Sequence, residues 1–315
     1  MKRFHKLIGI ILSLTMITLI SGCGGSSSSS DATVGSTPPS TNVETGVLSL
    51  NITDAPLWKK LDDKVVTEVN IAVIDVEYNH DGNWTKATDF NATTFNLIDL
   101  QDGKSLHLGD MVLPVGHYTE IRFILAIPEK DGEVKSNPDC NITFEDNSSV
   151  PLFVPSGGQS GYKAKVEFDI TAEAQIELTA DWDASRSVVS AGNSGKYLLK
   201  PVIRCVVTEL SGWINGTVVD VTDYNATDSL VVYAYKDDNY TEDEPEEFAN
   251  AVSSDYVNMT DGNFTLPFLG AGLYDLVTAH YDDGNFTGVV DVKEDVEVEI
   301  ATKTLVDVNT SDYTP

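Results

Sequence analysis

From Gly46 onward, short runs of residues alternate between apolar and polar, and this period of two constrains the fold more than any other feature. Side chains of a β-strand point to opposite faces in turn, so each run predicts a half-buried strand. The clearest runs are Leu48–Ile52, Tyr162–Ile170 and Ile176–Trp182. Turn-forming pairs separate such runs, among them Asp81-Gly82, Asp102-Gly103 and Asp131-Gly132. The pattern predicts an all-β fold with two tandem β-sandwiches.

Two stretches of different composition precede the alternating region. Residues 1–22 combine a basic head with an apolar run that ends in small residues, which is typical of an export signal. The apolar run is short for a membrane span, and Cys23 follows it directly. We therefore expect a lipoprotein signal that is cut before Cys23, with acylation of this cysteine. Residues 23–45 are rich in Ser, Thr, Gly and Pro, which predicts a flexible tether.

Acylation of Cys23 would anchor the protein in the cell envelope. Gly24 after the cysteine resembles the pattern of lipoproteins that are sorted to an outer membrane. The sequence does not decide which face of that membrane the protein would reach. The chain has 49 Asp+Glu against 20 Lys+Arg, a formal net charge of -29, which would repel nucleic acid and anionic lipid surfaces. The expected partners are therefore the membrane, through the lipid anchor, and an envelope or surface protein or glycan, but no nucleic acid.

Four motifs in the first alternating region resemble one family. They are Ser49–Pro56, Leu113–Tyr118, Asp181–Val188 and Tyr197–Arg204. Taken in this order, they are similar to DUF4382, a domain of unknown function found in prokaryotic lipoproteins. The resemblance covers about residues 46–208. It implies a lipoprotein β-domain without an assigned activity, and we expect this domain to span residues 46–210.

A second unit is expected over residues 211–301. Its first strand is bounded by glycines, and an Asp-Gly-x-Phe hairpin and a Leu-x-Ala-Gly-x-Tyr turn follow at 261–264 and 269–274. These features resemble the carboxypeptidase regulatory-like, prealbumin-type β-sandwich. The resemblance implies that Phe264 and Leu266 point inward and that the unit is a stalk or adhesive spacer, without peptidase activity. Residues 302–315 are expected to form a tail.

Asn-x-Ser/Thr sequons are the strongest chemical signal in the chain. It has 19 asparagines, of which 12 open a sequon, where chance would give about 3. Nine of these 12 have an acidic residue two positions earlier. This extended form resembles the acceptor that certain bacterial oligosaccharyltransferases recognise. The nine expected N-glycosylation sites are Asn83, Asn91, Asn141, Asn147, Asn225, Asn239, Asn263, Asn285 and Asn309.

Turn chemistry offers a second explanation for these sequons. Asp-Gly-Asn is a favourable turn sequence, which accounts for Asn83, Asn263 and Asn285 but not for Asn91 or Asn141. In an extended chain, the residue after the asparagine points to the opposite face, and large apolar residues often stand there. We therefore expect these neighbours to anchor the strand inward while the asparagine points outward. They include Ile52, Trp84, Ile142, Tyr240, Phe264 and Phe286.

Cys140 and Cys205 share strand faces with apolar residues, so both thiols are expected to point inward. In an exported protein, an inward pair can be oxidised to a disulfide. The bridge would close a loop of about 65 residues and contribute about 4 kcal/mol. Two separately buried thiols are the alternative, and the sequence leaves both possibilities open.

One group of residues has the composition of an acid/base site. Asp181 and Asp183 stand close to Arg186, and two carboxylates can act as a general acid and a general base. Alternation, however, places Asp181 outward beside an inward Trp182. A polar turn tied by Arg186 is therefore the other interpretation.

No cofactor is expected, with Ca²⁺ as one open possibility. The acidic runs 241–247 and 282–283 offer oxygen ligands, but neither fits an EF-hand loop. A solvated acidic loop is therefore the favoured interpretation of both runs.

Two functions are compatible with these features. The first is a non-enzymatic, lipid-anchored envelope protein that acts as an interaction, adhesive or structural module and carries N-glycans. The alternative is a carbohydrate-active or hydrolytic accessory protein that uses Asp181, Asp183 and Arg186. A deep cleft with carboxylates at this turn would favour the alternative, and a solid sandwich with Asp181 exposed would favour the first.

Overall fold

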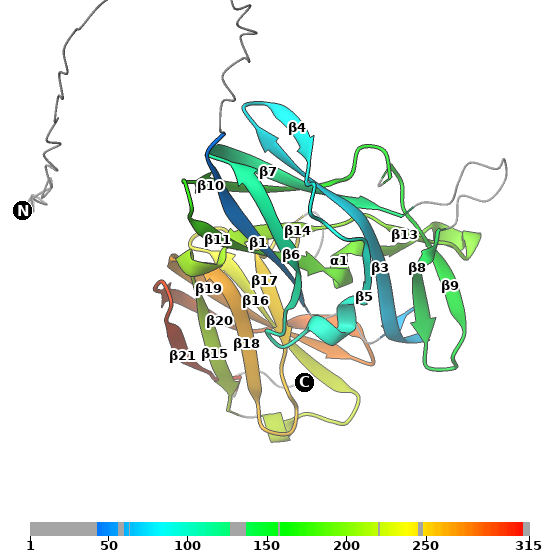
Figure 1. Cartoon of the computed structure of the whole chain (residues 1–315). Helices are drawn as coiled ribbons and strands as arrows, with labels where there is room; N and C mark the ends of the chain where they lie inside the picture. The colour runs from blue at the N-terminus through cyan, green and yellow to red at the C-terminus, as the bar shows by residue number, and fades with distance from the viewer. Residues whose placement is uncertain are drawn as a thin grey trace, which may run out of the picture. The chain divides into compact units, whose positions relative to one another are not determined.

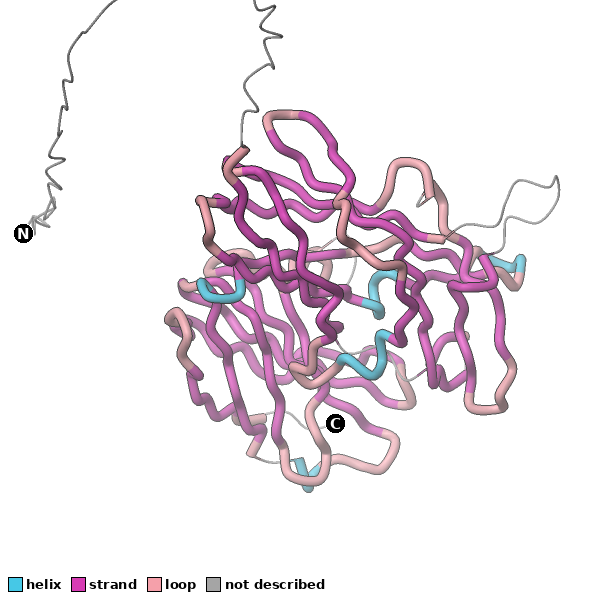
Figure 2. Tube along the Cα trace, in the orientation of Figure 1, coloured by secondary structure: helices cyan, strands magenta, loops and turns pink. Residues whose placement is uncertain are grey.

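The computed structural model describes residues 43–55, 60–62, 64–126, 137–156, 158–219, 221–244 and 248–310. Most residues in these ranges lie in β-strands, which confirms the predicted all-β fold (Figure 2). The expected signal, Cys23 and the Asp131-Gly132 turn lie outside the described residues.

Two sheets form what we call the first sheet pair (Figure 1). Sheet I has the strand order β14-β11-β1-β6, and sheet II has the order β10-β7-β3-β8-β9-β13-β12, with β2, β4 and β5 beside β3. The strands of sheet I are β1 (Thr45–Ala55), β6 (Leu106–Pro114), β11 (Gln175–Asp183) and β14 (Ile203–Val207). The strands of sheet II are β2 (Lys60–Leu61), β3 (Lys64–His80), β4 (Asn83–Lys86), β5 (Thr93–Asn96), β7 (Gly116–Leu125), β8 (Asn137–Phe144), β9 (Ser149–Phe153), β10 (Tyr162–Ile170), β12 (Val188–Ser190) and β13 (Tyr197–Leu199).

The second sheet pair is smaller. Sheet III has the order β18-β15-β21, and sheet IV has the order β17-β16-β19-β20. The strands of sheet III are β15 (Ser211–Val218), β18 (Asn263–Gly270) and β21 (Lys303–Val308). The strands of sheet IV are β16 (Asp228–Lys236), β17 (Ser253–Tyr256), β19 (Gly272–Asp282) and β20 (Asn285–Val298).

Short helices connect some of the strands. They are η1 (Leu97–Leu100), α1 (Ala184–Ser187), η2 (Gly192–Ser194), η3 (Thr208–Leu210) and η4 (Val221–Asp223). None of the helices within the described ranges has the length and apolar character that crossing a membrane requires.

The alternation in the sequence produces the core of the first sheet pair. Leu48, Leu50 and Ile52 of β1 all point inward and are at most 1% exposed. Across the core, Trp182 of β11 meets Phe123 of β7 edge to face, with ring centroids 5.3 Å apart. Sheets I and II therefore face each other as the two layers of a sandwich.

Asp-Gly turns lie where the sequence places them. Asp81 and Gly82 have φ values of 51° and 80°, and Asp283 and Gly284 have φ values of 48° and 84°. Positive φ at both central residues is typical of a two-residue turn between antiparallel strands, and aspartate and glycine tolerate it best. These turns join β3 to β4 and β19 to β20.

The second sheet pair has its own core, which includes Phe264 and Leu266 at 3% and 0% exposure. Both side chains point inward, as expected. The predicted tail at 302–315 is wrong for residues 303–308, which form β21. Thr304, Val306 and Val308 alternate with exposed residues there, and this short run pairs in parallel with β15.

The two cores draw on different parts of the chain. The first contains buried residues from Leu48 to Cys205, and the second contains buried residues from Ile214 to Val308. The described residues from Val43 onward nevertheless form one compact unit. The division into domains at 46–210 and 211–301 stays a prediction.

Candidate functional site

The acidic turn lies at the end of β11, where the strand becomes helix α1. Asp183 is the N-cap of α1, and its Oδ1 accepts hydrogen bonds from Arg186 N at 2.9 Å and Ser185 Oγ at 2.5 Å. Its Oδ2 lies 2.5 Å from Arg186 Nε. Such a cap satisfies backbone N–H groups that have no partner in the first turn of a helix. Arg186 therefore ties the turn, as one of the two interpretations predicted.

Asp181 contradicts the prediction that it points outward into solvent. Its side chain is only 8% exposed, and its Oδ2 accepts a hydrogen bond from Arg204 Nη2 at 2.7 Å. The residue does lie on the outer face of sheet I, but this face is not open to solvent. Strand β17 of the second sheet pair contacts β1, and β18 contacts β14 (Figure 1).

Two arginines cross from the first sheet pair to the second. Arg204 Nη1 donates to the carbonyl of Phe268 at 2.7 Å, and its Nη2 donates to that of Pro267 at 3.3 Å. Arg186 Nη1 donates to the carbonyl of Ala249 at 3.0 Å. Since each guanidinium also binds a buried aspartate, the turn and its surroundings form a polar junction between the sheet pairs. We call this set of contacts the junction.

Burial dominates the electrostatics of the junction. It raises the pKa of Asp54 well above its ordinary value, although Ala184 N donates to the Oδ1 of this carboxyl at 2.9 Å. It also raises the pKa of Asp181, and the positive charge of Arg204 opposes this rise. Asp255 of β17 is 4% exposed, and burial raises its pKa to about 7. Carboxyl groups that are removed from water favour their neutral form.

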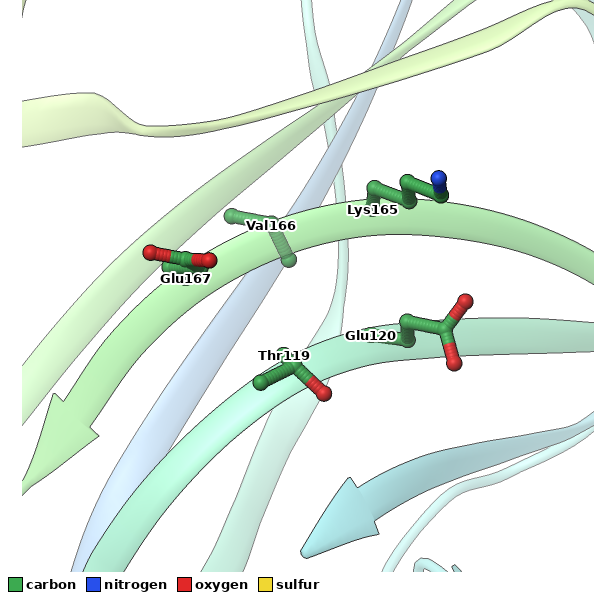
Figure 3. Close-up of a pocket in the computed structure, with 5 residues that line it drawn as sticks. All are labelled: Thr119, Glu120, Lys165, Val166 and Glu167. Atoms are coloured by element: carbon green, nitrogen blue, oxygen red, sulfur yellow. The ribbon is translucent and has the colours of Figure 1, made fainter. Parts of the chain in front are cut away.

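Two hollows in the surface lie away from the acidic turn. One of about 390 Å³ lies between β7 and β10, and its lining residues are Thr119, Glu120, Lys165, Val166 and Glu167 (Figure 3). Another of about 490 Å³ lies between β20 and β21. The carboxylates of the turn line neither hollow. Asp181 lines neither hollow, and it is not exposed either, because the second sheet pair covers it. The position of Asp181 therefore matches neither of the two arrangements that would have separated the two functions.

Within the described part of the chain, no three His, Cys, Asp or Glu side chains are grouped so as to hold a metal ion. Of the acidic runs that suggested Ca²⁺, residues 241–244 and 282–283 belong to this part and residues 245–247 do not. Binding of Ca²⁺ stays a prediction.

The asparagines of the extended sequons lie mostly at the surface. Eight of the nine are exposed, and they lie in loops and turns or at the start of a strand: Asn83, Asn91, Asn147, Asn225, Asn239, Asn263, Asn285 and Asn309. Asn141 is half-buried within β8, where its Oδ1 accepts a hydrogen bond from Asn70 Nδ2 at 3.2 Å.

Sequons without the acidic residue differ in their surroundings. Asn51 and Asn215 are half-buried within strands, and their Nδ2 groups donate to Glu177 and Thr265. Asn258 is exposed.

The residues that follow the asparagines only partly anchor the strands as expected. Phe264 is buried and Trp84 is half-buried under the guanidinium of Arg122, which lies 4.3 Å from the ring centroid. Phe286 contradicts the expectation because it is 37% exposed. It follows the tight turn at Asp283-Gly284, and its ring packs only against the rings that the structure places beside it, those of Phe248 at 5.5 Å and Tyr281 at 5.6 Å between centroids.

Both cysteines point inward as expected, with Cys140 in sheet II and Cys205 in sheet I. The described residues include no disulfide, and oxidation of this pair stays a prediction. The backbone N–H of Ala72 donates to Cys140 Sγ at 3.3 Å. Burial raises the pKa of the Cys205 thiol to about 12, which keeps it protonated and unreactive.

A buried histidine network was missed at the level of sequence. His280 Nε2 lies 3.1 Å from Asp228 Oδ1, with both side chains at most 4% exposed, and His280 Nδ1 lies 2.5 Å from Thr287 Oγ1. Asp228 Oδ2 accepts a hydrogen bond from Asn225 N at 2.6 Å. The network joins the loop that carries the Asn225 sequon to the start of β20, which carries the Asn285 sequon. Strand parity contained the signal, since Asp228 and His280 share the core face with Leu230.

Comparison with protein families gives one match. Residues 45–201 match the sequence model of DUF4382, a domain of unknown function. This range contains the acidic turn and β1, whereas Arg204 and the second sheet pair lie beyond it. The carboxypeptidase regulatory-like resemblance of residues 211–301 stays a prediction. The comparison with curated proteins finds no match.

Comparison with solved structures gives several matches. The Bacillus anthracis TIE protein is 13% identical over 84% of this chain, which spans 34% of that protein, with a TM-score of 0.18. The shaft pilin SpaA from Lactobacillus rhamnosus GG is 11% identical, covers 86% of this chain and 99% of its own, and has a TM-score of 0.21. The minor pilin of Streptococcus agalactiae is 10% identical, with coverages of 83% and 94% and a TM-score of 0.19. With TM-scores this low, nothing about function is carried over from these proteins.

Proposed function

We propose that the protein is a non-enzymatic, lipid-anchored module of the cell envelope that carries N-glycans and acts in adhesion or as a structural spacer. The observation that carries this proposal is the exposure of eight of the nine asparagines in extended sequons. Glycosylation requires an acceptor that the transferase can reach, and an exported, anchored chain is the kind of protein that meets such an enzyme. The expected partner is an envelope or surface protein or a glycan.

The polar residues of the acidic turn support the non-enzymatic part of this proposal. Asp183 caps α1, and Arg186 and Arg204 donate to carbonyls of the second sheet pair. A general acid or base must reach the proton that it transfers, whereas these groups are engaged in holding the junction together. No observation favours the hydrolytic alternative.

The lipid anchor has a direct test in the native host. Replacing Cys23 with serine should move the protein from the membrane fraction to the soluble fraction, because serine cannot carry the acyl chains. Fractionation combined with labelling by a clickable fatty acid measures both effects. Ser27→Ala is the matched control, and it should stay labelled and membrane-bound. A Cys23→Ser protein that stays in the membrane fraction with its label would exclude this anchor.

Intact-glycopeptide mass spectrometry on the native protein tests the glycans. We expect glycan on the eight exposed asparagines of extended sequons, and bare Asn51 and Asn215, which are half-buried within strands. Asn258 is the matched control for the acidic residue, since it is exposed but has Tyr256 two positions earlier.

A variant separates recognition of the acidic residue from simple exposure. Asp89→Ala should leave Asn91 exposed while removing the acidic residue, so its glycan should be lost. Retention of that glycan, together with glycan on Asn258, would mean that exposure alone selects the sites. If all nine asparagines are bare, the glycan part of the proposal fails, while the anchor is judged separately by the Cys23→Ser variant.

A further inference from the structure

Strand β21 forms an open edge of the second sheet pair. It pairs in parallel with β15 on one side and is the last strand of sheet III. An edge strand presents backbone N–H and C=O groups that can pair with another strand. A hollow of about 490 Å³ beside this edge is lined by residues of β21 and of β20 in the opposite sheet, and Thr304 Oγ1 of β21 donates to the carbonyl of Glu297 in β20 at 2.7 Å.

The direction of the backbone groups along β21 follows from its hydrogen bonds. Trp213 N donates to the carbonyl of Thr302, and Val219 N donates to that of Val308, so the even-numbered carbonyls face β15. Successive carbonyls along a strand point to opposite sides. Those of Lys303, Leu305 and Asp307 therefore face the open edge. Lys293 Nζ confirms this direction, since it reaches the carbonyl of Asp307 from outside the sheet at 2.8 Å.

The side chains of the same three residues are all exposed. Leu305 is 81% exposed, more than any other large hydrophobic residue in the described ranges. Lys303 lies two positions before Leu305 and Asp307 two positions after it, so all three side chains lie on the same face of the sheet. The strand thus presents a cation, an apolar side chain and an anion at equal spacing along one edge.

We propose that β21 pairs antiparallel with β21 of a second copy of this chain, about a two-fold axis at Leu305. In this register, each Lys303 stands opposite Asp307 of the other copy, and the two Leu305 side chains stand opposite each other. Opposite charges directly across an antiparallel pair stabilise it, and like charges destabilise it. The charges along β21 are therefore complementary to those of a second β21 that runs in the opposite direction, as a two-fold interface requires. The pairing would join the two three-stranded sheets into one continuous sheet.

The backbone supports the same register. Residues whose N–H and C=O groups face the edge exchange both hydrogen bonds with the residue opposite. Leu305 would do so with Leu305 of the other copy, and Lys303 with Asp307. The contact is a single short strand, so we expect a weak association. Lys293 competes for the carbonyl of Asp307, and Lys293→Ala should therefore strengthen the association.

Charge reversal tests the proposed register. The full chain is produced in a host without N-glycosylation, so that glycan on Asn309 does not interfere, and is studied in detergent by analytical ultracentrifugation. Lys303→Asp and Asp307→Lys each place like charges opposite each other at two positions, and each should weaken dimerisation about tenfold or more. The combined variant restores opposite charges at both positions and should dimerise like the unmodified chain. Thermal unfolding checks that all variants fold.

A cysteine at the two-fold axis gives a second measurement that also detects weak association. The Cα atoms of an opposed, hydrogen-bonded antiparallel pair lie about 5.5 Å apart, which suits a disulfide. Leu305→Cys should therefore form a covalent dimer under mild oxidation. Val219→Cys is the matched control, at a site that is 52% exposed but not on the axis. Equal crosslinking of both variants, a monomer at every concentration, or a combined charge variant that stays monomeric would each overturn the proposal.

Discussion

Replacing Arg204 with alanine is expected to lower the free energy of unfolding by about 3–5 kcal/mol, the range for removing one partner of a buried ion pair. Arg204 is the counter-ion of Asp181, whose side chain is 8% exposed. Without the guanidinium, the buried carboxyl of Asp181 must either keep an unpaired charge or take up a proton, and the carbonyl of Phe268 loses its donor at 2.7 Å. Urea denaturation at neutral pH, followed by tryptophan fluorescence, measures the change.

Two further variants distinguish a buried ion pair from a general effect of losing a cation. Lys104→Ala removes a surface partner of Asp102, where the two side chains are 65% and 72% exposed, and should change stability by about 1 kcal/mol or less. Adding Asp181→Asn to Arg204→Ala removes the unpaired charge and should recover a large part of the loss. Equal costs for Arg204→Ala and Lys104→Ala would contradict the buried junction.

Asp255 is expected to make the protein more stable in mild acid than at neutral pH. Burial raises the pKa of its carboxyl to about 7 in the folded state, against about 3.9 for an unfolded chain. The folded state therefore favours the protonated form. The resulting stability is fully present below about pH 4 and is lost as pH rises to about 7. Three pH units at about 1.4 kcal/mol each give about 4 kcal/mol.

Asp255→Asn isolates this contribution. An amide oxygen can still accept the hydrogen bond from Thr265 N, which lies 2.6 Å from Asp255 Oδ2, but it never ionises. The variant should match the parent near pH 4 and exceed its stability by up to about 4 kcal/mol above pH 7. Asp54 and Asp181 also have raised pKa values, but they affect both proteins equally and cancel in the difference.

The exposed Asp89→Asn variant is the matched control for this pH series, because it removes one negative charge without removing a buried carboxyl. Its stability curve should run parallel to that of the parent. If the free energy of unfolding of Asp255→Asn also ran parallel to that of the parent over this pH range, the carboxyl of Asp255 would have the same pKa in the folded and unfolded states. That result would contradict the prediction.

The fold could be predicted from local sequence because its causes are local. Alternation determined which residues of β1 face the core, from Leu48 to Ile52, and Asp-Gly pairs determined where the chain turns. The inward positions of Phe264, Leu266 and both cysteines follow from the same parity. Strand parity assigns residues to a face without any knowledge of distant segments.

The junction could not be predicted in this way. Parity correctly placed Asp181 on the outer face of sheet I, but it cannot show that β17 and β18 cover that face. Arg204, the counter-ion, is 23 residues away along the chain. The tail prediction fails at β21, because only two of its three core-facing residues, Val306 and Val308, are apolar, and its partner β15 lies far upstream.

The position of β1 has a mechanical consequence. This strand is the first of the described chain, yet it lies in the interior of sheet I, parallel to β11 over Val47–Ala55 and antiparallel to β6 on its other side. The hydrogen bonds of such ladders run across the strands. A pull along β1 from its Thr45 end would therefore load both ladders in shear, with many bonds sharing the tension, instead of peeling them apart one at a time.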